Sequence, residues 1–238
     1  MYEALSVWDV LMQKLPYTVI VNLYSILLAI PLGLVFGIYA ALKKNKWQDH
    51  VISTAVMIFV SVPSYVYAFL VQYFLCFKWQ LFPFQMKAGY DYLSWDTFVS
   101  LVPAILSLGF GTIAGLTRYV RAELTEVLTS DFLLLARTKG LSRAQTTVRH
   151  ALRNAMLPIV TSLGMSISGL IGGSVVIEQI FNWNGMGTLF LNANNTNDYP
   201  LMMGIMIFLS GFALLANLVT DLCYSLLDPR VKLGGSRR

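Results

Sequence analysis

The sequence of 238 residues has few charged side chains, since Asp, Glu, Lys and Arg make up only 12% of it. This is about half the share that is usual in soluble domains. Hydrophobic residues make up 56%, which excludes a disordered chain and leaves too little polar surface for a soluble globule. The composition therefore predicts an all-α integral membrane protein.

Groups that carry out catalysis are also scarce. The two cysteines, Cys76 and Cys223, lie in apolar stretches, which fits packing and excludes a disulfide framework or a metal-ligand spacing. The two histidines, His50 and His150, have no neighbouring Cys, Asp or Glu pattern of a metal site or a nucleophile–base pair. No Gly-rich run precedes Lys and Ser or Thr, so there is no phosphate-binding loop. We expect a chain that is not an enzyme and holds no cofactor or metal.

Long apolar runs fill most of the chain. A hydrocarbon core about 30 Å thick needs roughly 20 helical residues to cross it. Five segments qualify, at residues 18–42, 51–77, 98–120, 157–180 and 201–227. No linker separates them, so we predict one transmembrane domain over residues 1–238, with five helices and a polar loop at 121–156.

The basic residues are distributed unevenly between the loops. The first loop, the third loop with its edge residue Arg118, and the C-terminal tail carry 14 of the 17 Lys and Arg residues. Cytoplasmic loops have an excess of Lys and Arg. The distribution predicts a multi-pass protein of the cell membrane with its N-terminus outside and its C-terminus in the cytoplasm. Because the charges flank apolar runs, the net charge of +5 does not indicate a nucleic-acid partner.

Small residues recur at four-residue spacing within the predicted spans, as Gly33 with Gly37 and Gly111 with Gly115. In lipid this spacing lets helix backbones approach closely. The pattern is compatible with simple packing of one bundle and also with helix faces that line a transport path. Pro63 frees a backbone carbonyl within the second predicted span.

The most patterned polar stretch is the knob, which we define as residues 131–156. Asp131 fits the start of a short helix, and Gly140 fits the position after its last residue. Ser142 and Gln145 have the spacing of a capping box, which predicts a second helix. Two helices that meet sharply here form a compact protrusion. It either docks on a protein or lies on anionic lipid.

Three separated motifs resemble a known family. The knob contains the series Asp131, Ala136, Arg137, Thr138, Lys139, Gly140 and Leu141, then Arg149, His150, Ala151, Leu152, Arg153, Asn154 and Ala155, followed by Pro158. The segment at residues 178–200, called the outer segment below, contains Glu178, Phe181, Asn182, Trp183, Asn184, Gly185, Met186, Gly187, Asp198, Tyr199 and Pro200. The tail has Asp221, Tyr224, Leu227, Asp228, Pro229 and Arg230. Together they resemble the permeases of bacterial ABC importers, within the oligopeptide, dipeptide and nickel group.

The resemblance implies the partners and the sites. Family members work as two homologous permease subunits with two cytoplasmic ATPase subunits, which bind ATP and Mg²⁺, and an external solute-binding protein. It implies that the knob contacts an ATPase through Asp131, Ala136, Arg137, Lys139, Gly140 and Leu141. It also implies that the binding protein faces Phe181, Trp183, Gly185, Gly187, Asp198, Tyr199 and Pro200.

The resemblance also bears on the solute and on the number of spans. It implies a peptide or a chelated metal such as nickel as the solute, and a further leading span that these 238 residues do not contain. The alternative function is a membrane scaffold or assembly subunit without a solute path of its own.

The charge distribution generates a test of orientation. A cysteine introduced at Asn195 should react with a membrane-impermeant reagent added outside the cell, whereas one introduced at Ala144 should not. Labelling of Ala144 but not Asn195 would reverse the predicted topology.

Overall fold

The computed structural model describes residues 6–86, 94–156, 159–160 and 171–227. Within these ranges every regular element is helical. The long elements are α1 (Val7–Leu42), α2 (Trp47–Ser61), α4 (Trp95–Leu128) and α10 (Tyr199–Leu227). The shorter ones are α3 (Ser64–Val71), the π-helical η1 (Gln72–Lys78), α5 (Asp131–Thr138), α6 (Arg143–Gln145), the π-helical η2 (Thr146–Leu152), α8 (Val175–Ile180) and α9 (Met186–Asn195).

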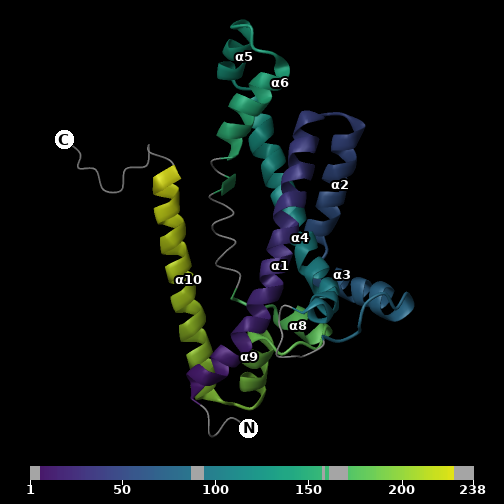
Figure 1. Cartoon of the computed structure of the whole chain (residues 1–238), viewed down its shortest axis with the longest axis vertical. Helices are drawn as coiled ribbons and strands as arrows, with labels where there is room; N and C mark the ends of the chain where they lie inside the picture. The colour runs from purple at the N-terminus through teal and green to yellow at the C-terminus, as the bar shows by residue number, and fades with distance from the viewer. Residues whose placement is uncertain (1–5, 87–93, 157–158, 161–170, 228–238) are drawn as a thin grey trace, which may run out of the picture.

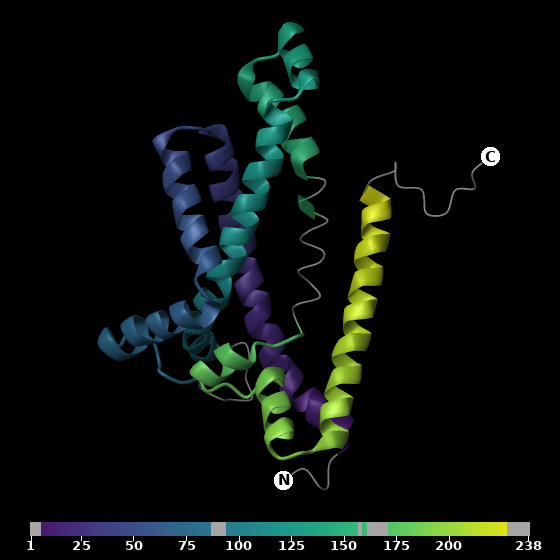
Figure 2. The same ribbon diagram turned by 180° about the vertical axis from the view of Figure 1, so that it is seen from behind.

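The helices run between two ends of an elongated molecule (Figure 1). α1 and α4 lie side by side and both rise towards the knob, while α2 returns from the knob end (Figure 2). At the opposite end lies the outer segment, which contains the end of α8 and all of α9, and α10 rises again from it. The loop after α1 and the knob thus lie at one end, as the charge distribution predicts for segments on the same side of a membrane.

Among the described residues, three helices are long and apolar enough to cross a membrane, namely α1, α4 and the part of α10 at Tyr199–Leu222. A fourth span is counted if α2 and the helix that follows it are taken together. The predicted span at 157–180 lies mostly outside the described residues, of which it includes only 159–160 and 171–180.

The predicted span at 51–77 contains a sharp bend. After Ser61 the chain bends by 101°, and α3 with η1 extends sideways from the other helices (Figure 1). Pro63 is the cause, because it lacks a backbone N–H and restricts the residue before it to an extended conformation. Val62 indeed has φ −84° and ψ 129°.

The first helix starts earlier than predicted. α1 begins at Val7, where the Ser6 hydroxyl accepts a hydrogen bond from the Asp9 amide at 3.2 Å, and it continues through Pro16. The helix extends to the N-terminal side of Pro16 because the apolar side chains of these added residues are buried. Val10 and Leu11 are buried against Met186 of α9 and neighbouring apolar residues of α10.

Close packing of α1 against α4 forms the centre of the fold. A Cβ on Gly33 would lie 2.8 Å from Leu116 Cδ2, and one on Gly37 would lie 2.6 Å from Val120 Cβ. Both distances are too short for carbon atoms, so only glycine permits this approach. The predicted close contact is confirmed for this pair, whereas a Cβ on Gly115 would meet nothing within 4 Å.

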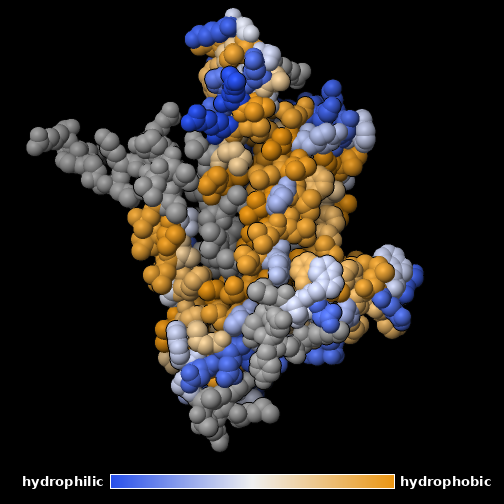
Figure 3. All heavy atoms as spheres, viewed as in Figure 1, coloured by the Kyte–Doolittle hydropathy of each residue, from blue (hydrophilic) through white to orange (hydrophobic). Residues whose placement is uncertain are grey.

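The surface divides by polarity along the same axis. Apolar residues form a broad band across the middle of the molecule, and hydrophilic residues gather at the knob and around the outer segment (Figure 3). This is the pattern of a protein whose middle lies in hydrocarbon and whose ends meet water.

The α1–α4 contact predicts the effect of adding one methyl group. Gly37→Ala should lower the unfolding midpoint of the purified subunit in detergent, because overpacking costs about 1–3 kcal/mol. Gly115→Ala is the matched control on α4 and should leave the midpoint unchanged or raise it slightly, since alanine favours helix. Equal midpoints for the two variants would contradict the close approach of α1 and α4.

Candidate functional site

The knob has the structure that its sequence predicts. α5 starts at Asp131, and Gly140 follows it with φ +87°, a left-handed conformation that favours glycine. The Ser142 amide donates to Gln145 Oε1 at 3.0 Å, and the Gln145 amide donates to Ser142 Oγ at 3.2 Å. Both bonds of the predicted capping box are therefore present, and the second helical stretch begins as α6 and continues as η2.

The knob is fixed to the long helices by its own small core. Leu133 of α5 and Ala151 of η2 are buried in one cluster with Ala41 of α1 and Leu124 of α4. Thr146 is also buried, and its hydroxyl donates to the Ser142 carbonyl at 2.8 Å. The knob therefore continues the packing of α1 on α4.

The outer side of α5 is exposed and partly apolar. Leu134 and Leu135 are 61% and 57% exposed, and Asp131 and Lys139 are exposed beside them. Ala136 and Leu141 are half-buried, Gly140 is exposed, and the backbone of Arg137 lies within α5. The six residues predicted to contact an ATPase thus lie on one short helix and the turn that follows it.

At the opposite end, a buried carboxylate organises the outer segment. Glu178 is 5% exposed, and its Oε2 accepts a hydrogen bond from the Thr188 amide at 2.7 Å. Its Oε1 accepts from the Thr18 hydroxyl of α1 at 3.3 Å, and Thr18 Oγ1 accepts from the Met186 amide at 2.8 Å. Glu178 and Thr18 together satisfy amides in the first turn of α9, where an anion is favourable.

Glycines let the backbone close around this carboxylate. A Cβ on Gly185 would lie 2.7 Å from Glu178 Oε1, and a Cβ on Gly187 would lie 2.7 Å from the Val175 amide nitrogen. Side chains at these positions would displace the carboxylate or separate α8 from α9. Gly185 and Gly187 therefore have a structural role in the outer segment.

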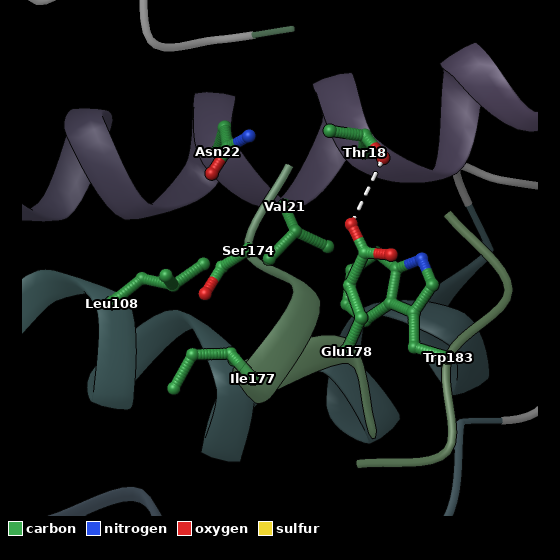
Figure 4. Close-up of a pocket in the computed structure, with 8 residues that line it drawn as sticks. All are labelled: Thr18, Val21, Asn22, Leu108, Ser174, Ile177, Glu178 and Trp183. Carbon is green, nitrogen blue, oxygen red and sulfur yellow. Dashed lines mark hydrogen bonds between the residues drawn. The ribbon is translucent and has the colours of Figure 1, made fainter. Parts of the chain in front are cut away.

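A cavity of about 10 Å³ lies beside Glu178. Figure 4 shows the Glu178 carboxyl directed at the Thr18 hydroxyl, with the Trp183 ring beside it. Trp183 Nε1 is buried without a hydrogen-bond partner among the described residues. The cavity has room for about one water molecule, so it does not hold a solute.

Of the residues that were predicted to face a binding protein, some are exposed on the outer segment and others are buried. Phe181 and Trp183 are each 4% exposed and pack in a core cluster with α1 and α4. The Asp198 carboxylate accepts a hydrogen bond from the Leu201 amide at 3.1 Å and so caps α10. Tyr199 and Pro200 are exposed.

Two contacts join residues far apart in the sequence and were not predicted. Thr18 lies 160 positions before Glu178, and no local pattern distinguishes it from other span threonines. Asp49 at the start of α2 forms a bidentate ion pair with Arg121 of α4, with distances of 2.5 and 2.8 Å. The sequence feature that could have indicated this ion pair is the basic Arg121 at the start of the predicted loop 121–156. Over the described ranges no three His, Cys, Asp or Glu side chains gather as a metal site requires.

Comparison with known proteins places the chain in a family. Residues 33–233 match the family described as binding-protein-dependent transport system inner membrane component. The chain belongs to this family. Among its relatives, the dipeptide transport system permease protein DppB of Bacillus subtilis is 35% identical over 228 residues, which cover 96% of this chain and 71% of that protein. The oligopeptide transport system permease protein OppB of Haemophilus influenzae is 33% identical over 233 residues, which cover 97% and 74%.

Solved structures of this transport class share the fold. An inward-facing structure of the MetNI methionine ABC transporter has a chain that aligns with a TM-score of 0.73 at 17% identity, covering 92% of this chain and 96% of that one. An amino acid ABC transporter crystallised with histidines aligns with a TM-score of 0.64 at 14% identity. The predicted family and its helical membrane fold are therefore confirmed, and the chain is a multi-pass inner-membrane protein.

The Glu178 network predicts the stability of the outer segment. Glu178→Ala should lower the unfolding midpoint in detergent, because each buried amide left without an acceptor costs about 1–3 kcal/mol. Glu178→Gln keeps an acceptor and should fall between the alanine variant and the wild type. Asn184→Ala, an exposed change in the same loop, should have no effect. A wild-type midpoint for Glu178→Ala would contradict the network.

Proposed function

We propose that the chain is the transmembrane permease subunit of an ATP-driven importer for dipeptides or oligopeptides. The observation that carries this proposal is the similarity over nearly the whole chain to permease proteins named for dipeptide and oligopeptide transport. Because both the family match and the helical fold agree with it, the scaffold alternative has no observation in its favour. The proposal also includes related solutes such as chelated nickel.

The proposal includes the arrangement in the membrane. The chain has five spans, the fourth of them over residues 157–180, with the knob in the cytoplasm and the outer segment outside. Support comes from the two ends of the molecule, since the basic first loop and the knob share one end and the outer segment lies at the other. The chain itself holds no cofactor and no ATP-binding loop, so ATP and Mg²⁺ bind to partner ATPase subunits.

The knob is the proposed docking element for the ATPase. Its exposed leucines at 134 and 135 offer an apolar contact, and Arg137 and Lys139 add two positive charges to the same short stretch of sequence. Because its core is shared with α1 and α4, movement of an attached ATPase reaches the long helices without a flexible joint. The second permease subunit completes the path, and the external binding protein meets the exposed Tyr199 and Pro200.

Uptake measures the proposed function directly. Cells that carry the ATPase, the second permease and the binding protein should accumulate a labelled dipeptide or oligopeptide only when this chain is present. Uptake at the same rate without the chain would favour the scaffold function. Uptake of neither peptides nor chelated nickel, in an assembled complex that hydrolyses ATP, would overturn the proposed solute class.

The left-handed conformation of Gly140 gives a sharper test of the docking element. Gly140→Val should reduce copurification of the ATPase, because a non-glycine residue in this conformation costs about 1–2 kcal/mol and the turn must rearrange. Gly140→Asn is the matched control, since asparagine tolerates this conformation. Both variants should insert in the membrane normally. Wild-type coupling of uptake to ATP in Gly140→Val would contradict the assignment.

The charges on the knob are tested separately from its shape. Arg137→Glu together with Lys139→Glu should leave the turn intact and reverse the charge offered to the ATPase, which slows association most at low salt. The measurement is ATPase retention on the immobilised permease at two salt concentrations. Retention that is equal to wild type at both would place these two side chains outside the interface.

A further inference from the structure

A groove of about 280 Å³ lies between α2 and α4, apart from the knob and the outer segment. α2 lines it with a row of apolar side chains, Val56, Met57 and Val60, and α4 lines it with Thr117, Arg118 and Arg121. One wall is therefore apolar and the other is polar and basic. None of its lining residues belongs to the knob or to the outer segment.

The two arginines in the groove differ in their charge balance. Arg121 is neutralised by the buried Asp49 through the bidentate pair described above. Arg118 lies one helical turn away and is exposed, and no acidic side chain among the described residues pairs with it. The groove thus presents one uncompensated positive charge. An arginine in a membrane helix normally has a partner or faces a polar cavity.

The position of Arg118 along α4 indicates the depth at which it lies. α4 begins at Trp95, which is 74% exposed, and tryptophan is enriched at membrane interfaces. Arg118 follows 23 residues later, a rise of about 35 Å along the helix. Since the hydrocarbon core is about 30 Å thick, Trp95 in one interface places Arg118 at the level of the headgroups of the opposite leaflet.

The apolar wall lies on the hydrocarbon side of this charge. α2 starts at the exposed Trp47 on the knob end and runs towards the middle of the molecule (Figure 1). Asp49, in its first turn, is level with Arg121. Val56, Met57 and Val60 come two to three turns further along α2, so they lie deeper in the bilayer than Arg118 does. The Ser53 hydroxyl lines the groove between the two levels.

An anion above an apolar tail matches both walls, and this is the chemistry of a phospholipid. We propose that the groove binds one anionic phospholipid, with its phosphate on Arg118 and an acyl chain along Val56, Met57 and Val60. A soluble anion would leave the apolar wall without a ligand, and a neutral apolar molecule would leave the arginine without a counter-charge. Basic pockets between membrane helices on the cytoplasmic side bind such headgroups.

Lipid binding to the full chain tests the site. The purified subunit, and separately the assembled importer, are titrated with dioleoyl phosphatidylglycerol, and bound lipids are counted by native mass spectrometry. Arg118→Gln should weaken binding about fivefold. Arg149→Gln makes the same change in charge at an exposed position of the knob and should leave binding unchanged. Arg118→Lys keeps the charge and should retain most of the binding, which covers the case in which the glutamine variant does not fold.

Further arms identify the ligand. Met57→Gln should weaken phosphatidylglycerol binding because it places a polar group on the apolar wall, and dioleoyl phosphatidylcholine should bind the wild type more weakly than phosphatidylglycerol does. Displacement of the lipid by excess inorganic phosphate, with no effect of Met57→Gln, would show a site for soluble anions and overturn the proposal. Equal binding by wild type and Arg118→Gln would also overturn it. So would loss of the lipid in the assembled importer, because the second permease would then cover the groove.

Discussion

The close approach of α1 and α4 at Gly33 and Gly37 is the contact on which the rest of the structure depends. It brings Ala41 and Leu124 together at one end, where they form the base of the knob. At the other end α1 offers Thr18 to the Glu178 carboxylate. Without a hydrophobic force between helices in lipid, such contacts rely on packing and hydrogen bonds. The absence of side chains at two positions thus determines where both ends of the molecule lie.

The two ends differ in how they are stabilised. The knob combines a capping box with a small apolar cluster and leaves two leucines of α5 exposed. The outer segment is built around a buried carboxylate that accepts bonds from backbone amides and a hydroxyl. An exposed apolar surface is available for contact with another protein. A buried polar network instead favours one conformation, because removing a partner leaves a donor without an acceptor.

Local sequence patterns predicted the knob well and the long-range contacts poorly. The Ser142 and Gln145 spacing and the glycine at 140 are determined by hydrogen bonds within a few residues, so they are visible in the sequence. The bend at Pro63 was visible only as a freed carbonyl, because hydropathy continues unchanged through residues 64–77. Phe181 and Trp183 belong to a family motif, yet a motif does not distinguish a residue that packs inside from one that faces a partner. The Asp49–Arg121 pair depends on how α2 returns along α4, which sequence spacing does not reveal.

The position of Thr18 and Ala41 on one helix has a mechanical consequence. About 35 Å of α1 separates them, and α4 braces the helix between them at Gly33 and Gly37. A tilt of about 5° around the knob end would therefore displace the Thr18 end by about 3 Å, by the geometry of a rod of this length. This is comparable to the length of the hydrogen bonds that join Thr18 to Glu178 and Met186. A small rotation at one surface would therefore change the contacts that α1 makes with the first turn of α9 at the other.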